Sequence, residues 1–390
     1  MKILIVNELL ISGGAEQSCL KMKKLLQKHH DVIYLTFDND FEKKINEVED
    51  KKNILNIKLG DKRINRFIFN IFLYMKIRKK IKAINPDKII LNNLSSSPIT
   101  QLKAMKGYDV YQIIRDYYAV CPKSTAIKND YSVCKGYKFN NCCKICGKSL
   151  KMYMRLYLIR RMEKLRKKIV KKLISPSEKL NEYLLDCGYD SCCINNPMDI
   201  NEECKNNDKQ LNEGTRKYVY LGAVNEIKGI FKLIEVFNDF AKDKDVNLTI
   251  IGKCSEKSDE EMLDNYIKDN EKINYLGYKT HKEVVEILKS FDFIVVPSLW
   301  IENYPTTALE GMLYKCFVIG SNRGGIPEIV GKDRGLLFNI LDNKDIENIL
   351  NQTYNMNKDE YKETIERAYK YVCENNSYER YYKNIMNILQ

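Results

Sequence analysis

The sequence predicts an α/β protein built from two doubly wound units, and the spacing of apolar residues along its 390 positions is the main reason. Short apolar runs alternate with longer segments that have apolar residues at three- and four-residue spacing. This alternation indicates strands and helices in turn, and therefore parallel sheets with right-handed crossovers. It begins again after residues 195–214, where Asn-Asn-Pro and a polar, charged run are typical of a linker. We predict a first domain over 1–196, a second over 215–377 and a final helix over 378–390.

The individual elements follow from the same pattern. In the first half, the apolar runs that predict buried strands are residues 3–6, 32–36, 88–92 and 110–114. The segments with helical spacing are residues 16–28, 65–84 and 149–168. In the second half, strands are expected at residues 218–222, 246–251, 273–277 and 293–297. Because ligands of such sheets bind beyond the carboxyl ends of the strands, we expect the functional site there, in the cleft between two facing units.

Composition excludes several classes of protein. With 8 Pro, 18 Gly and 44% hydrophobic residues, the chain is neither collagen-like, nor of low complexity, nor a small disulfide scaffold. No apolar run reaches the ~18 residues that a membrane span needs. Residues 1–8 are predicted to form a first buried strand and not a signal peptide. We therefore expect a cytoplasmic protein, whose 13 cysteines are thiols or metal ligands and not disulfides.

Charge is distributed unevenly along the chain. Residues 1–200 contain 39 Lys and Arg against 20 Asp and Glu, whereas the remainder contains 26 and 32. The first half is therefore expected to face an anionic partner. We find no helix-turn-helix, zinc-finger or aromatic RNA-binding motif in it, so nucleic acid is not the expected partner.

The most basic segment is residues 148–172, with 11 basic residues and one acidic residue. Its predicted apolar helical face consists of Leu150, Met154, Tyr157, Leu158, Met162 and Leu165. Residues 65–82 repeat this basic amphipathic pattern, which favours an anionic membrane surface or a lipid diphosphate. Burial of the apolar side within the domain is the alternative.

The strongest functional motif is Glu-Asn-Tyr-Pro-Thr-Thr-Ala-Leu-Glu at residues 302–310, which follow an expected strand and open a helix. A helix that starts at Thr306 and Thr307 leaves backbone N–H groups that favour an anion such as phosphate. Glu310 would lie about one turn into that helix, where its carboxylate could accept hydrogen bonds from a ribose diol. Helix capping together with two solvated carboxylates is the simpler alternative.

This motif and several other segments resemble the retaining nucleotide-sugar glycosyltransferases of glycosyltransferase family 4. Proteins of this family have the GT-B fold of two facing Rossmann-like domains. Glu302 and Glu310 are similar to the paired glutamates, with seven residues between them, that mark the family. The other matching segments are Gly13-Gly14-Ala15-Glu16, Tyr220-Leu221-Gly222, Lys228-Gly229, Gly324-Gly325-Ile326-Pro327-Glu328 and Gly335-Leu336-Leu337-Phe338. The resemblance covers nearly the whole chain, and with it we expect a C-terminal helix that can cross back to the first domain.

The resemblance implies a role for each matched residue. Glu310 would hold the donor ribose, and Glu302 would contact hydroxyls of the transferred sugar. Lys228 would neutralise the diphosphate. Gly13 and Gly14 would allow the first loop to approach the diphosphate closely. The backbone of four residues would touch sugar and phosphate: Tyr304, Pro305, Thr306 and Thr307. Cations and helix N-termini suit this place because the nucleoside diphosphate gains negative charge as the glycosidic bond breaks. No catalytic metal is implied.

Two positions depart from the family pattern. The family usually has Arg where this chain has Ala223, five residues before Lys228, so we expect Lys253 or Arg323 to supply the missing cation. A slow or inactive enzyme is the alternative. At Arg115-Asp116, the family commonly places a His before the Asp, near the 6-position of the donor sugar. Arg115 is a permanent cation suited to a carboxylate, which predicts a uronic-acid donor or a phosphate contact, with pairing to Asp116 as the alternative.

Two further motifs raise the question of metal binding. Asp38-Asn39-Asp40 looks like the metal-binding DxD of the other main glycosyltransferase fold, but it ends a second strand, and we interpret it as a turn. Five cysteines fall within residues 117–147, which we predict to be an insert. Cys143 and Cys146 have zinc-knuckle spacing, and the expected ligands of a structural zinc are Cys121, Cys134, Cys143 and Cys146. Free thiols are the alternative.

The sequence thus predicts a cytoplasmic glycosyltransferase that is peripheral at the inner face of the membrane. It would move a sugar from a UDP- or GDP-sugar to a lipid-linked or growing glycan acceptor. Heavy use of Lys, Ile and Asn hints at an AT-rich genome and a role in bacterial surface polysaccharide assembly. The alternatives are another GT-B enzyme, such as a nucleotide-sugar epimerase, and a non-catalytic scaffold that keeps the fold.

Overall fold

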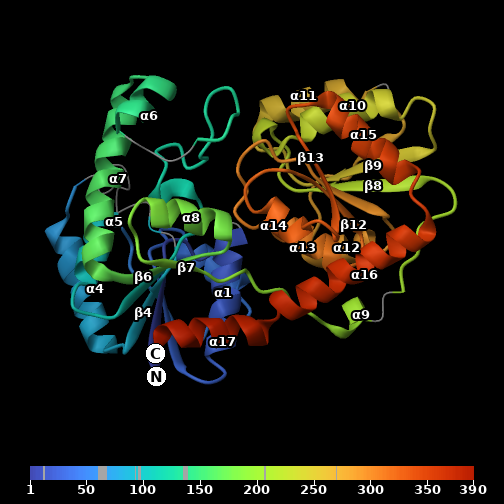
Figure 1. Ribbon diagram of the computed structural model, residues 1–390. Helices are drawn as coiled ribbons and strands as arrows, with labels where there is room; N and C mark the ends of the chain where they lie inside the picture. The colour runs from blue at the N-terminus through green and yellow to red at the C-terminus, as the bar shows by residue number, and fades with distance from the viewer. Residues whose placement is uncertain are drawn as a thin grey trace. The chain divides into compact units, whose positions relative to one another are not determined.

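The computed structural model describes residues 1–11, 14–59, 68–92, 94, 98–134, 139–205, 208–268 and 270–390. The chain divides into two compact units, each with its own parallel sheet (Figure 1). Unit 1 comprises Met1–Asn196 together with Tyr381–Gln390, and unit 2 comprises Pro197–Arg380. The predicted fold class, two doubly wound parallel sheets, is therefore confirmed.

Unit 1 contains a seven-stranded sheet in the order β3-β2-β1-β4-β5-β6-β7, in which every pairing is parallel. Its strands are β1 Lys2–Asn7, β2 Asp31–Thr36, β3 Ile54–Asn56, β4 Lys88–Leu91, β5 Val110–Ile113, β6 Val170–Ser175 and β7 Ser191–Cys193. The strand order reverses between β1 and β4. At such a switch point the crossover connections diverge to opposite faces, so side chains at the carboxyl ends of the two strands are left accessible.

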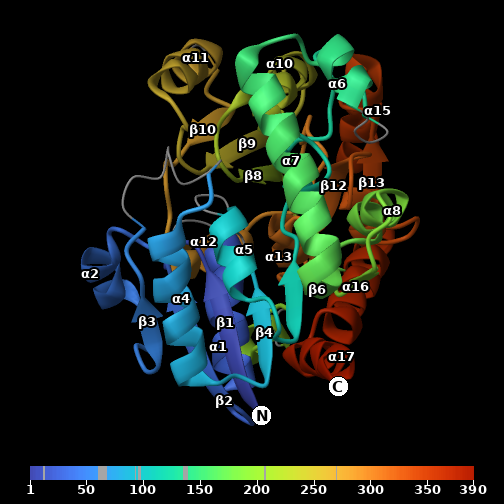
Figure 2. The same cartoon turned by 90° about the vertical axis from the view of Figure 1, so that its left-hand side faces the viewer.

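Helices cover both faces of the unit 1 sheet. They are α1 Gly14–Leu26, α2 Phe41–Lys44, η1 Ile45–Glu47, α4 Ile71–Ile84, α5 Pro98–Ala104, η2 Tyr117–Ala119, α6 Phe139–Ile145, α7 Leu150–Ile169, α8 Glu178–Asp186 and α17 Tyr378–Leu389. Alternate residues of β1 lie on opposite faces of the sheet, because successive side chains of a strand point in opposite directions. Leu4 and Val6 pack in one cluster with α4, α5 and α7, the helices in front of the sheet in Figure 2. Ile3 and Ile5 pack with α1 and α17.

Unit 2 contains a six-stranded parallel sheet in the order β10-β9-β8-β11-β12-β13. Its strands are β8 Arg216–Leu221, β9 Val246–Ile251, β10 Ile273–Tyr275, β11 Phe293–Val296, β12 Phe317–Ser321 and β13 Gly335–Phe338. Its helices are α9 Glu202–Lys205, η3 Glu226–Lys228, α10 Ile230–Phe240, α11 Lys257–Ile267, α12 His281–Leu288, α13 Thr306–Leu313, α14 Ile326–Val330, α15 Asn343–Tyr354 and α16 Lys358–Asn375. The switch point of this sheet lies between β8 and β11.

Each face of the unit 2 sheet has its own core. On one face, Tyr218 of β8 stacks on Phe293 of β11 with ring centroids 4.8 Å apart, and Phe237 of α10 packs edge-on against it. On the other face, Val219 and Ile294 pack with apolar residues of α13 and α16. Both cores contain large aromatic or branched side chains, which fix the register of β8 against β11.

The eight predicted strands are found with ends that differ by at most two residues, whereas β3, β6, β7, β12 and β13 were not predicted. The described part of the helix predicted at 65–84 begins at Ile71, where the Asn70 side chain caps it by accepting from the Leu73 N–H. Residues 65–67 lie outside the described residues. In the part of the chain that the structure describes, no helix is long and apolar enough to cross a membrane.

The predicted apolar face of the 149–168 helix is wrong in three positions. Leu150, Met154 and Tyr157 of α7 are exposed, whereas Met152, Leu156 and Ile159 are buried with Met162. The buried side is rotated relative to the prediction because α7 packs on the sheet and on α5 through Leu158 and Met162. A second apolar stripe therefore remains on the outer side of the helix.

Candidate functional site

Lys228 and Glu302 form an ion pair at the switch point of the unit 2 sheet. Lys228 lies in η3, after β8, and Glu302 lies in the loop after the neighbouring strand β11. The Lys228 Nζ atom is 2.7 Å from Glu302 Oε1, and the Ser298 hydroxyl donates to the same oxygen at 2.7 Å. Glu302 is only 7% exposed. A buried carboxylate with two donors holds the lysine in a defined place beyond the strand ends.

The loops that carry this pair are pinned to each other by backbone contacts. The Ile227 carbonyl accepts from the N–H groups of Leu299 (3.0 Å) and Trp300 (3.2 Å). Gly229 adopts φ +74°, and a Cβ atom there would lie 1.7 Å from the Pro297 carbonyl oxygen. Only glycine permits this approach, since its φ is left-handed and it has no side chain. The Lys228 ammonium also lies 4.5 Å from the centroid of the Trp300 ring, a cation–π contact.

A third loop, after β12, supports Glu302 from its backbone. The Gly325 N–H donates to the Glu302 carbonyl at 2.7 Å, and Gly324 adopts φ +58° against that same carbonyl. The Ser321 hydroxyl donates to the Ser298 carbonyl at 2.8 Å. Arg323, in this loop, is 5% exposed, and burial lowers the pKa of its guanidinium. The loop therefore places a second cation beside the residues that hold Glu302.

The start of α13 is as predicted, at Thr306 after Pro305. Thr306 is exposed, and Thr307 and Glu310 are half-buried. The first N–H groups of a helix have no partner within it, and they favour an anion. Tyr304 differs from its neighbours: it is 4% exposed, and burial raises its pKa well above the usual value. Its hydroxyl is 3.4 Å from that of Tyr371, so the Tyr304 side chain belongs to the core, and only its backbone faces the start of α13.

Lys253 lies near Ala223, the position at which the family usually has an arginine. Ala223 is exposed, and its carbonyl accepts from the Tyr220 hydroxyl at 2.6 Å. The next residue, Val224, donates its N–H to the carbonyl of Lys253 at 2.9 Å. Lys253 is exposed and follows β9 at the same end of the sheet. Its position suits a replacement for the missing arginine.

In unit 1, a chain of polar side chains runs across the carboxyl ends of β1, β4 and β5. Asn92 Nδ2 donates to Asn7 Oδ1 at 3.0 Å, and Arg115 Nε donates to Asn92 Oδ1 at 3.0 Å. Arg115 Nη1 also donates to Asn196 at 2.5 Å. Asp116 caps η2 by accepting from the Tyr118 N–H at 2.7 Å, and burial raises the pKa of its carboxyl. Two asparagines are thus among the partners of Arg115, and they orient it across the strand ends.

The first glycine-rich loop is only partly described. Gly13 lies outside the described residues. Gly14 is the exposed first residue of α1.

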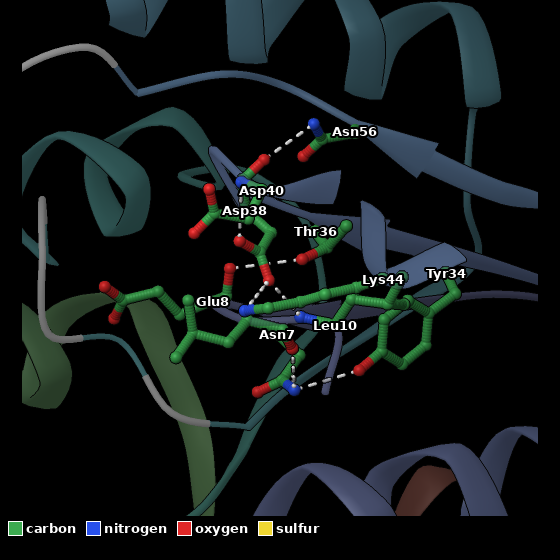
Figure 3. A network of polar contacts seen from close by, with 10 residues as sticks. Asn7, Glu8, Leu10, Tyr34, Thr36, Asp38, Asp40, Lys44 and Asn56 are labelled. Atoms are coloured by element: carbon green, nitrogen blue, oxygen red, sulfur yellow. Dashed lines mark hydrogen bonds and ion pairs between the residues drawn. The ribbon is translucent and has the colours of Figure 1, made fainter. Parts of the chain in front are cut away.

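Asp38 is a structural acceptor, as the interpretation of a strand-end turn requires. Its carboxylate accepts from the N–H groups of Leu10 and Asp40, each at 3.0 Å, and from Lys44 Nζ at 2.9 Å (Figure 3). Burial alone would raise the pKa of Asp38, but these donors outweigh it and hold the pKa below its usual value. The side chain is 1% exposed, whereas Asp40 is exposed. The two carboxylates therefore have different environments.

The cysteine cluster differs from the prediction. Cys121, Cys134, Cys142 and Cys146 line a cavity of about 10 Å³, next to Tyr183. Cys142 takes the place predicted for Cys143 because the segment is helical: Cys146 donates its N–H to the Cys142 carbonyl, so these two residues are one turn apart on one side. Cys143 does not line the cavity, and it packs together with Cys142 in a small core with Met152 and Leu156. Burial, and then the neighbouring thiols, raise the pKa of Cys142 to about 12.

Within the described ranges, no three His, Cys, Asp or Glu side chains are grouped so that they could hold a metal ion. The prediction of a structural zinc is therefore not supported. The described thiols act as the apolar core of the insert.

Comparison with known proteins supports a glycosyltransferase. Residues 201–371 match the family model described as glycosyl transferases group 1. This match covers most of unit 2, the part of the chain that carries Lys228, Glu302 and Glu310. No curated protein matches the chain.

Three solved structures illustrate the likeness of the fold. A glycosyltransferase from Rickettsia africae is similar over 100% of this chain and 97% of its own, with 18% identity and a TM-score of 0.74. Anabaena Alr3699/HepE in complex with UDP is similar over 100% of this chain and 99% of its own, with 14% identity and a TM-score of 0.75. The structure described as trehalose-6-phosphate from E. coli bound with UDP-2-fluoro glucose is similar over 100% of this chain and 99% of its own, with 11% identity and a TM-score of 0.72. The fold is that of the GT-B glycosyltransferases.

Sequence reasoning missed three residues that build the site. Ser298 and Trp300 hold Glu302 and Lys228, and Asn225 caps η3 by accepting from the Lys228 N–H at 3.1 Å. Asn225 could have been found, because an asparagine three residues before a loop lysine is a capping signal. Ser298 and Trp300 could not, because their contacts depend on how two distant loops meet.

The hydrogen bonds that Asp38 accepts predict how the stability of the fold depends on pH. A carboxyl whose folded pKa lies below its unfolded value stabilises the fold above the unfolded pKa, and this stabilisation is lost as the pH falls through the folded pKa. We expect Asp38→Asn to lower the free energy of unfolding by about 1–3 kcal/mol at neutral pH. The deficit should narrow as urea unfolding is repeated from about pH 7 down to about pH 3. Asp40→Asn is the control and should change little; equal effects of the two substitutions would contradict the structural role of Asp38.

The pinned loops give a second prediction. Gly229→Ala places a Cβ against the Pro297 carbonyl at a left-handed φ, so we expect unit 2 to lose about 2–4 kcal/mol in urea unfolding. Gly214→Ala is the matched control, since a Cβ there meets nothing within 4 Å. If both variants unfold at the wild-type urea concentration, the close approach of the two loops is not a constraint on the fold.

Proposed function

We propose that this protein is a retaining glycosyltransferase that moves a sugar from a UDP- or GDP-sugar to a lipid-linked or growing glycan acceptor. The observation that carries the proposal is the Lys228–Glu302 pair, which lies at the switch point of the domain that matches the glycosyltransferase model. Proteins of similar fold bind such nucleotides: solved structures include complexes with UDP, UDP-glucose and UDP-2-fluoro glucose.

The chemistry of the site suits a departing diphosphate. An ammonium has three N–H donors, and Glu302 accepts only one of those of Lys228, so the others can reach a phosphate. Lys253 and the start of α13 add positive potential at the same end of the sheet. As the glycosidic bond breaks, the negative charge that develops on the phosphate is stabilised by these groups. Glu310, half-buried in the second turn of α13, is proposed to accept from the ribose hydroxyls.

The partners of Glu302 support the proposal of a retaining mechanism. Glu302 already accepts from Lys228 and Ser298, so it orients groups and is not placed as a general base. In a front-face reaction, the departing phosphate oxygen takes the proton of the acceptor hydroxyl, and the new bond forms on the face from which the diphosphate leaves. Catalysis is then mainly positioning and electrostatic stabilisation.

We further propose that the acceptor lies on unit 1 and that the enzyme works at the inner face of the membrane, in bacterial surface polysaccharide assembly. The excess of basic residues in the first half supports this placement. Arg115, oriented by Asn92 and Asn196, is proposed to contact a carboxylate or phosphate of the donor or acceptor. A donor screen in which neutral hexoses outperform glucuronate and galacturonate would reject a carboxylate of the donor sugar as the partner of Arg115.

A panel of nucleotides and nucleotide sugars tests the proposal most directly. Calorimetry should show binding of UDP or GDP, and nucleotide release from the matching sugar should depend on an acceptor. Isomerisation or release without acceptor would instead identify an enzyme such as an epimerase. Absence of binding for every nucleotide would identify a non-catalytic scaffold.

Lys228→Ala should reduce transfer by about 100-fold or more, because the cation acts on the charge of the transition state. The substitution also leaves the Glu302 carboxylate buried without its ion-pair partner, so part of any loss could come from instability. The double variant Lys228→Met with Glu302→Gln removes both charges and should recover stability but not transfer. Lys232→Ala, at a half-buried lysine of α10 that pairs with Glu235, is the control. If Lys228→Ala transferred sugar at the wild-type rate, Lys228 would not be part of the site.

Glu310→Ala should weaken UDP or GDP binding by about tenfold, since it would remove two hydrogen bonds to the ribose. Thermal melting should change little, because the side chain is half-buried. Glu347→Ala, on α15, provides a matched control. Unchanged nucleotide affinity in Glu310→Ala would separate this residue from the nucleoside.

A further inference from the structure

Unit 1 has a concentration of exposed apolar side chains that the fold does not require. Among the described residues, fifteen large apolar side chains are exposed, and eight of them lie on or next to the N-terminal halves of α4 and α7. They are Ile68, Ile71, Phe72, Met75, Leu150, Tyr153, Met154 and Tyr157. We call this set the α4/α7 face. Scattered exposed apolar residues need no explanation, but a cluster of this kind marks an interaction surface.

Helical periodicity explains why these residues share a surface. Leu150, Tyr153, Met154 and Tyr157 follow one another at spacings of three and four, so they form a single stripe along α7, opposite the buried Met152, Leu156 and Ile159. On α4, Phe72 and Met75 are likewise three residues apart and lie opposite the buried Leu73, Ile77 and Ile81, whereas Ile68 precedes the helix. Phe72 and Leu150 are each 77% exposed, so neither is accounted for by the core.

The α7 stripe and the segment just before α4 line an open groove. A cavity of about 610 Å³ is lined by Ile68, Phe69, Tyr153, Met154, Tyr157 and Arg161. Among the described residues that line the groove, Arg161 alone is charged, and it donates to the Tyr157 hydroxyl at 2.7 Å. In Figure 2, α4 and α7 flank α5 on the same side of the sheet. A groove with apolar walls and a cation at its edge suits a hydrocarbon chain attached to an anionic group.

The charge around the α4/α7 face is of one sign. The sequences of α4 and α7 contain thirteen basic residues and one acidic residue, Glu163, which pairs with Lys167. Within the described residues, the exposed Lys76, Lys79, Lys151 and Lys164 make no ion pair. By contrast, the lysines after α7, Lys171 and Lys172, pair with Asp109 and Asp190. Positive charge is thus left unneutralised beside the apolar stripe.

We propose that the α4/α7 face is the surface by which the protein binds an anionic membrane. Its apolar and aromatic side chains enter the boundary between headgroups and acyl chains, and the surrounding lysines and arginines bind lipid phosphates. A second copy of the chain is the poorer occupant, since it would bring two faces of the same charge together. This inference gives a place to the membrane association proposed above, and rests on that part of the proposed function alone.

Co-sedimentation of the full chain with vesicles tests the proposal. We expect binding to vesicles of equal parts phosphatidylglycerol and phosphatidylcholine, weakened by salt, and little binding to phosphatidylcholine alone. Phe72→Ser with Leu150→Ser should weaken binding by about tenfold or more, because both side chains lose their burial in lipid. Tyr278→Ser with Leu341→Ser removes two exposed apolar groups (73% and 48% exposed) from unit 2, and should leave binding within about twofold of wild type.

Charge reversal provides an independent arm. Lys151→Glu with Lys164→Glu should reduce binding to anionic vesicles by more than about tenfold, since each lysine near such a surface contributes about fivefold. Lys257→Glu with Lys370→Glu, on unit 2, is the matched control. UDP and GDP binding by calorimetry should be unchanged in all four variants, so that failure of the donor site and failure of membrane binding are told apart.

Three outcomes would overturn the proposal. Equal binding to neutral and anionic vesicles would show that the lysines do not contribute. Wild-type vesicle binding by the Phe72→Ser, Leu150→Ser variant would place the contact elsewhere on the chain. Self-association of the wild type that this variant abolishes, without vesicle binding, would assign the α4/α7 face to a second copy.

Discussion

The close approach between the turn after β8 and the loop after β11 is the constraint on which the candidate site depends. Gly229 allows it, and the Ile227 carbonyl secures it by accepting from two consecutive N–H groups. Only because the two loops touch can a lysine from the first reach a glutamate from the second. The third loop, after β12, then supports that glutamate through the backbone. Three strand ends are in this way combined into one polar arrangement at the switch point.

Much of the fold could be predicted because it depends on local patterns. Long apolar runs such as 246–251 and 293–296 are buried on both faces, and parallel strands of that kind stand out in a sequence. Four of the five missed strands lack this signal, whereas β12, Phe317–Ser321, is fully buried and has it. β3 and β7 have three partly buried residues each, β13 has one buried residue, and β6 begins with Val-Lys-Lys, which continues the basic pattern of α7. Their identity as strands comes from pairing with neighbours, which is a tertiary property.

The site was predictable to the extent that its residues follow directly after strands. Glu302 and Glu310 could be singled out for that reason, Lys228 was found through the resemblance to the family, and the structure brings Lys228 and Glu302 together. The partners of a side chain are harder to foresee. Arg115 bonds to Asn92 and Asn196, which are 23 and 81 residues away, and no local pattern identifies them. The cysteine set was mistaken by one position, because zinc-knuckle spacing and a helical turn select different residues from the same five thiols.

The position of Trp300 has a consequence for how this molecule can be observed. It is the single tryptophan in the chain, and it lies in unit 2 with its ring against the ammonium of Lys228. Light absorbed selectively by indole therefore reports on one half of the molecule only, from a point a few ångströms from the proposed phosphate contact. Unit 1, which holds no indole, is silent in such a spectrum, so the two halves can be followed separately without attaching a dye.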